Sequence, residues 1–125
     1  MTIHLEPRYR DHLLERFLRY VRVDTQSDEN STTSPSTARQ KDLGRMLEAE
    51  LRDLGCADAR MDEWGYVFAT VPPSPESLGP VVPVIGFLAH MDTSPATSGA
   101  NVNPQVLDYT GGDIVLPGAT GTGSL

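Results

Sequence analysis

The sequence contains a single cysteine, and that scarcity excludes two classes of protein. Cys56 is the only cysteine among 125 residues. An intrachain disulfide therefore cannot form, and a zinc finger built on cysteine ligands is excluded. A lone thiol is typical of a reducing compartment, so we expect a cytoplasmic protein.

Long apolar runs are also missing. The longest runs from Val81 to Ala89 and is interrupted by Pro83, whereas a helix that crosses a bilayer needs about 20 apolar residues. The first residues, MTIHLEPRYRDHLLERF, carry charges every few positions. A secretory signal would need an unbroken apolar stretch there. We therefore expect neither membrane insertion nor secretion.

Basic residues are too few to balance the acidic ones. Ten Lys and Arg stand against 17 Asp and Glu, which gives a net charge of -7. Such a field repels phosphate backbones and anionic lipids, so we expect no nucleic-acid or membrane partner. The length allows one modest core, whereas a complete two-domain enzyme needs a longer chain.

Two stretches show apolar residues at helical spacing. The first runs from Arg10 to Val23 and the second from Thr37 to Leu54. Their apolar stripes are Leu13, Leu14, Phe17, Leu18 and Val21, and Leu43, Leu47, Leu51 and Leu54. Thr37 and Gln40 have the spacing of a capping box, and Gly55 stands where a helix C-cap glycine belongs. The pattern predicts two amphipathic helices joined by an exposed loop at residues 27–36.

Short strands are predicted after the second helix. A weak one covers Ala59 to Asp62, and a better one covers Tyr66 to Val71 after a turn at Trp64-Gly65. The apolar run from Val81 to Ala89 is typical of a strand buried on both faces, as in α/β folds. The remainder, from Met91 to Leu125, is rich in turn formers and predicts a layer of loops. The fold class that we expect is α/β.

His90 and Asp92 follow the predicted buried strand directly. In open α/β sheets, functional groups gather at the carboxyl ends of strands. An extended chain would point both side chains the same way, and an imidazole with a nearby carboxylate suits a zinc site. The H-x-D motif is short, however. A structural histidine followed by an aspartate that caps the next loop explains it equally well.

Longer stretches resemble a known family. GFLAHMDTSP and SGANVNPQVLDYTGGDIVL look like the corresponding part of the peptidase T family, tripeptide aminopeptidases within the co-catalytic dizinc peptidases. LLERFLRYVRVDTQSDENSTTSPSTARQKDLGRMLEAELRDLG is similar to the opening helix, V-x-x-D-T-Q-S loop and second helix of that family. The resemblance extends from about Leu13 to Leu116.

The resemblance implies roles for two residues. His90 would ligate one of two zinc ions, and Asp92 would be the active-site aspartate that orients it. The family's bridging aspartate, Glu-Glu pair, further carboxylate ligand and distant histidine lie downstream of the region that this sequence covers. We therefore expect residues 1–125 to be an N-terminal fragment of the catalytic α/β domain. The lid or dimerisation domain and the remaining catalytic half would be absent.

The implied activity is release of the N-terminal residue from short peptides, with the isolated fragment inactive. A homodimer is expected only of the full-length enzyme. Two alternatives stay open: a related dizinc exopeptidase or deacylase with another substrate, and a non-catalytic remnant or interaction domain. The loop SGANVNPQ favours peptidase T. The segment from Asp24 to Ser27 is explained by a turn that ends the first helix.

Overall fold

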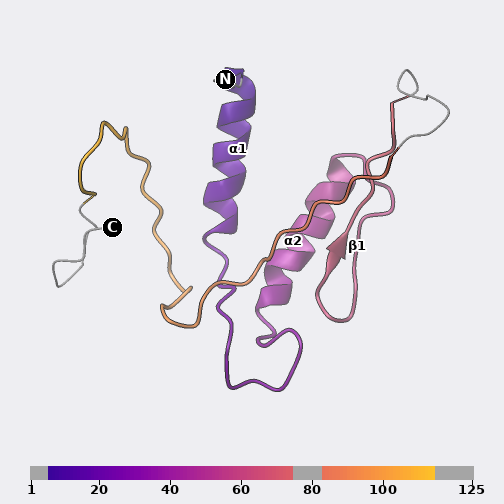
Figure 1. The fold of residues 1–125 in the computed structure, drawn as a ribbon, viewed down its shortest axis with the longest axis horizontal. Coiled ribbons are helices and arrows are strands. Elements are labelled where there is room, and N and C mark those ends of the chain that lie inside the picture. The colour runs from indigo at the N-terminus through magenta and orange to yellow at the C-terminus, as the bar shows by residue number, and fades with distance from the viewer. Residues whose placement is uncertain (1–5, 75–82, 115–125) are drawn as a thin grey trace.

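The computed structural model describes residues 6–74 and 83–114 of the chain (Figure 1). In chain order its elements are α1 (Pro7–Tyr20), α2 (Gln40–Asp53), β1 (Arg60–Met61) and β2 (Val67–Phe68). Two helices and a small sheet are compatible with part of an α/β domain, which is the predicted class in its coarse form. Within the described ranges, no helix is both long and apolar enough to cross a membrane.

Helix α1 is shifted by three residues toward the N-terminus relative to the prediction. Its first residue is Pro7, where the fixed φ of proline suits a helix and its missing N–H leaves no bond unmade. None of its residues is buried. Leu13 and Phe17, which belong to the predicted apolar stripe, are more than half exposed. The stripe is therefore present, but the described residues do not cover it.

Glu50 of α2 joins the two helices by polar contacts. Its carboxylate pairs with Arg16 and Arg19 of α1 and accepts a hydrogen bond of 2.7 Å from the Tyr20 hydroxyl. Partial burial, followed by the hydrogen bond to Glu50, raises the pKa of Tyr20 above its ordinary value. One largely buried carboxylate, 15% exposed, thus connects the two helices through polar contacts.

The predicted capping box at the start of α2 is wrong. The residue before the helix is Arg39, and its side chain makes no capping hydrogen bond. The Thr37 hydroxyl donates instead to the carbonyl of Gln26 at 2.8 Å, and the Gln40 side-chain amide donates to Thr37 Oγ1 at 3.1 Å. Thr37 is therefore used to hold the preceding loop, because that loop folds back onto the helix start.

The end of α2 agrees with the prediction. Gly55 follows the helix with φ of +95°, a conformation that strains any residue with a Cβ. The Gly55 amide donates to Arg52 and the Cys56 amide donates to Leu51, at 2.9 and 3.0 Å. This is the Schellman arrangement of a helix C-terminus.

The predicted strands form a hairpin that is shorter than expected. β1 and β2 pair antiparallel, with Arg60 opposite Phe68 and Met61 opposite Val67. In the turn, Asp62 Oδ1 accepts the amides of Trp64 and Tyr66 at 3.0 and 2.9 Å. The hairpin packs on α2 with little separation, since a Cβ on Gly44 would lie 2.6 Å from Met61 Sδ. The buried apolar residues in the described ranges are Leu43, Cys56 and Ala59.

The prediction of a buried strand from Val81 to Ala89 is wrong for residues 83–89; Val81 and Val82 lie outside the described residues. Residues 83–89 have no ladder partner, and Phe87 and Leu88 are 93% and 98% exposed. A strand buried on both faces needs neighbours at its edges and layers above and below. The only sheet among the described residues has two short strands, which pair with each other. The segment runs in the view across α2 (Figure 1).

The prediction of loops after the motif is confirmed for residues 91–114, which contain no helix or named strand. The rest of the predicted loop layer, residues 115–125, lies outside the described residues.

Gly55→Ala should lower the free energy of unfolding by about 1 kcal/mol, because alanine must adopt a left-handed backbone at that position. The urea midpoint, followed by circular dichroism at 222 nm, measures the change. Gly86→Ala is the matched control, since Gly86 has no positive φ and a Cβ there would meet nothing within 4 Å. Equal midpoints for the two variants would contradict the C-cap assignment.

The exposed apolar surface of residues 83–89 should cause concentration-dependent association of the chain. Phe87→Asp combined with Leu88→Asp should shift the sedimentation coefficient toward that of a monomer. Val71→Asp is the control, because Val71 is 83% exposed but lies outside the segment. A monodisperse monomer with cooperative thermal unfolding, before any substitution, would contradict the expectation.

Candidate functional site

The structure brings the two predicted site residues together. His90 Nδ1 and Asp92 Oδ1 lie 3.0 Å apart. Both side chains leave the same side of an extended stretch, as the alternation of an extended backbone predicts. The His90 side chain is 85% exposed and that of Asp92 is 44% exposed, so the imidazole is open to solvent.

The contact favours one tautomer of His90. An ionised carboxylate only accepts hydrogen bonds, so Nδ1 carries the proton and donates it to Asp92. The other ring nitrogen, Nε2, is then an acceptor with a lone pair. Metal-ligating histidines characteristically donate one ring N–H to a carboxylate and bind the ion through the other nitrogen. The arrangement is therefore compatible with a histidine that ligates a metal through Nε2.

The pair is among the residues that line an open groove of about 920 Å³. Residues of α1, the loop before α2, α2, the hairpin and the segment 87–92 line the groove. Its apolar lining includes Leu47, Leu51, Leu54, Trp64, Phe87 and Leu88. A mostly apolar groove with a few polar groups is a common setting for small-molecule sites.

The described residues supply only part of a metal site. Among them, no group of three or more His, Cys, Asp or Glu side chains is placed to hold an ion. Catalytic zinc sites typically use three protein ligands, and structural sites use four. His90 and Asp92 fit the role of one ligand with its orienting carboxylate, and a complete site would need further ligands.

A second contact fixes the position of the segment that carries the pair. Thr93, next to Asp92, forms a parallel bridge with Gln26. Its amide donates to the Thr25 carbonyl at 3.1 Å, and its carbonyl accepts the amide of Ser27 at 2.9 Å. The Gln26 side chain also donates to the Pro95 carbonyl at 3.0 Å. Residues 24–27 thus hold residues 93–95 in place through these hydrogen bonds, and we call residues 24–27 the rail.

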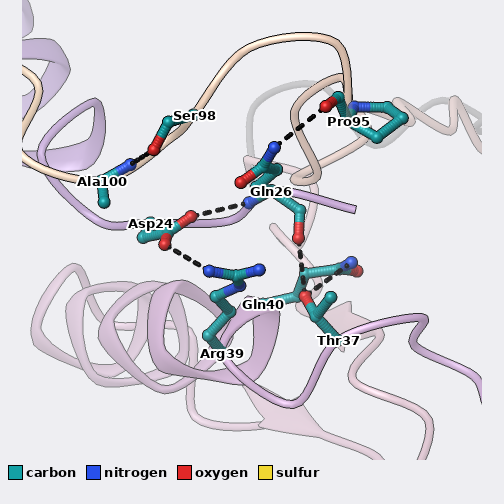
Figure 2. A network of polar contacts seen from close by, with 8 residues as sticks. All are labelled: Asp24, Gln26, Thr37, Arg39, Gln40, Pro95, Ser98 and Ala100. Atoms are coloured by element: carbon teal, nitrogen blue, oxygen red, sulfur yellow. Dashed lines mark hydrogen bonds and ion pairs between the residues drawn. The ribbon is translucent and has the colours of Figure 1, made fainter. Parts of the chain in front are cut away.

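The rail is fastened to the start of α2 (Figure 2). Asp24 accepts hydrogen bonds from Arg39 Nη1 at 2.6 Å and from the Gln26 amide at 3.0 Å, each through a different carboxylate oxygen. The Thr37 hydroxyl donates a hydrogen bond of 2.8 Å to the Gln26 carbonyl. Helix α2, the rail and the segment of the site are therefore connected through successive hydrogen bonds.

The sequence pattern of residues 24–27 predicts only a turn. The turn is real, since Asp24 binds an amide two residues ahead. Its contact with the segment of the site was missed, because no local pattern reveals a bridge between residues 66 positions apart. The resemblance of the D-T-Q-S stretch to a family motif was the one available signal.

Comparison with known proteins gives a consistent result. No family model matches the chain. Peptidase T of Geobacillus kaustophilus is 56% identical over 108 residues, and peptidase T of Bacillus subtilis is 53% identical over 108 residues. Each match covers 86% of this chain but 26% of the relative.

A third relative, peptidase T of Geobacillus thermodenitrificans, is 55% identical over the same share of both chains. The chain thus spans about a quarter of the length of the curated relatives that it matches. The resemblance recognised in the sequence is confirmed: this chain is similar to an N-terminal portion of peptidase T.

Proposed function

We propose that this chain is the N-terminal piece of a zinc-dependent aminopeptidase that releases the first residue of short peptides, tripeptides in particular. His90 is a zinc ligand in this proposal, and Asp92 is the catalytic aspartate that orients it. The full-length enzyme would hold two zinc ions, act in the cytoplasm and form a homodimer.

The contact of 3.0 Å between His90 Nδ1 and Asp92 Oδ1 carries the proposal. It supports a ligand role because it leaves Nε2 as the atom that can bind a metal. Similarity to peptidase T at 53–56% identity supports the peptidase class of the family. The contact supports the role of the two residues, and the similarity supports the class of enzyme, so the two observations support different parts of the proposal.

Bound zinc would supply Lewis-acid polarisation of the scissile carbonyl. The residues of this chain have two tasks beside it. His90 contributes one nitrogen donor, and Asp92 keeps the imidazole ring in a single orientation and increases its basicity. In this proposal neither residue is the general base, and that role would fall to another residue of the full-length enzyme.

A related dizinc exopeptidase or deacylase would use the same pair in the same way. The similarity to relatives named peptidase T favours the aminopeptidase. A non-catalytic remnant is the other alternative, and the incomplete donor set among the described residues is the observation that favours it. The non-catalytic alternative is separated from the main proposal by the substitutions described below, because a remnant should not support zinc binding and turnover in the full-length enzyme.

The chain by itself should not hydrolyse tripeptides, with or without added zinc, because one imidazole cannot hold a catalytic site. Release of a free amino acid from a tripeptide, followed by chromatography, measures this. The control is a blank with the same concentration of zinc and no protein. Turnover above that blank would show that the chain completes a site in another way.

His90→Ala and Asp92→Asn should differ when they are tested in a full-length peptidase T that carries this chain in place of its matching portion. His90→Ala removes a ligand, so zinc and activity should be lost together. Asp92→Asn keeps the ligand and should lower activity ~10–100-fold while more zinc is retained. Zinc is measured by atomic absorption and turnover by tripeptide hydrolysis.

His12→Ala is the matched control, because His12 is an exposed histidine of α1 that lies outside the groove. It should keep the zinc content and activity of the unsubstituted enzyme. If Asp92→Asn is equally active, Asp92 is a residue that caps a loop and its catalytic role is wrong.

A further inference from the structure

Asp24 is contacted from three directions. Arg39 of the α2 start donates to its Oδ2 at 2.6 Å, and the Gln26 amide donates to its Oδ1 at 3.0 Å. Gly99, which is buried, lies on the third side: a Cβ there would be 2.7 Å from Asp24 Oδ1. The carboxylate is therefore at the junction of α2, the rail and the loop that follows the site.

The position of residues 24–27, the rail, depends on these contacts of Asp24. Thr25 is 2% exposed, and its carbonyl and the Ser27 amide are the backbone partners of Thr93. If the Asp24 carboxylate is removed, the Gln26 amide loses its acceptor and Arg39 loses its partner. The Gln26 amide is part-buried, and a donor that loses its partner away from solvent is unfavourable, so the turn should rearrange and the bridge to Thr93 should weaken.

Thr93 is one residue from Asp92, and Asp92 orients His90. A movement of the bridge therefore passes directly into the segment that carries the proposed ligand. A misplacement of about 1 Å in a catalytic constellation can reduce the rate ~100-fold. A change at Asp24 can therefore alter the geometry of the His90–Asp92 pair.

We propose that Asp24 is a positioning residue for the His90–Asp92 pair, holding residues 24–27 on α2 so that these residues hold Thr93. The inference rests on the proposed function for its catalytic consequence. Its structural part, that Asp24 controls the bridge, stands on the contacts alone. The two parts are tested by different measurements.

The first experiment uses the 125-residue chain and amide hydrogen exchange observed by NMR. Asp24→Ala should increase the exchange rates of the Thr93 and Ser27 amides ~10-fold or more. The reference is the Asp62 amide, which donates to Tyr66 in the hairpin at 2.9 Å and should not change. Asp24→Asn should have a smaller effect, because its side-chain oxygen still accepts the Gln26 amide.

Asp42→Ala is the matched control. Asp42 also pairs with an arginine, Arg45, at 2.7 Å on α2, but both side chains are exposed and neither touches the rail. It should leave the bridge amides unchanged, as expected for an exposed ion pair.

Equal acceleration at the Thr93, Ser27 and Asp62 amides would mean general destabilisation and would overturn the inference. No acceleration in Asp24→Ala would overturn it as well, as would bridge amides that exchange freely in the unsubstituted chain.

The second experiment measures catalysis in the full-length enzyme that carries this chain. Asp24→Ala should lower kcat ~10-fold with zinc content retained and KM nearly unchanged, and Asp24→Asn should restore part of kcat. An unchanged kcat in a zinc-loaded enzyme would overturn the catalytic part. If the unsubstituted enzyme neither binds zinc nor turns over, the proposed function fails, while hydrogen exchange still decides whether Asp24 controls the bridge.

Discussion

The bridge between Thr93 and residues 25–27 is the interaction on which the described arrangement depends. It joins the part of the chain that contains the helices and hairpin to the part that contains His90 and Asp92. The remaining contacts of the second part, Gln26 with Pro95 and Gly99 against Asp24, cluster around the same point. The orientation of the site relative to α2 is therefore set by one small region and not by a broad apolar interface.

The local elements could be predicted from the sequence because local forces determine them. Helical periodicity located α1 and α2 to within three residues at each end. Gly55 was recognised as a C-cap because only glycine adopts its φ of +95° without strain. The side-by-side placement of His90 and Asp92 followed from the alternation of an extended chain.

The failures share a physical cause. Thr37 has capping chemistry, but its hydroxyl was taken by a carbonyl 11 residues earlier, and tertiary contacts override such local preferences. The apolar run ending at Ala89 has the composition of a buried strand. Burial, however, depends on neighbouring strands and covering layers, which the described residues do not provide. The resemblance to peptidase T pointed to His90 and Asp92, which the structure brings into contact, whereas among the described residues no group of three metal-binding side chains accompanies them.

The separation of the bridge from the hairpin along the chain has a consequence for the order of folding. α2, β1 and β2 are neighbours in sequence, so they can associate after closing short loops, which are entropically inexpensive. The contact between Ser27 and Thr93 spans 66 residues, and non-local contacts of this kind generally form slowly. The helix and hairpin should therefore be a template that exists first, onto which the segment with His90 and Asp92 docks in a late step.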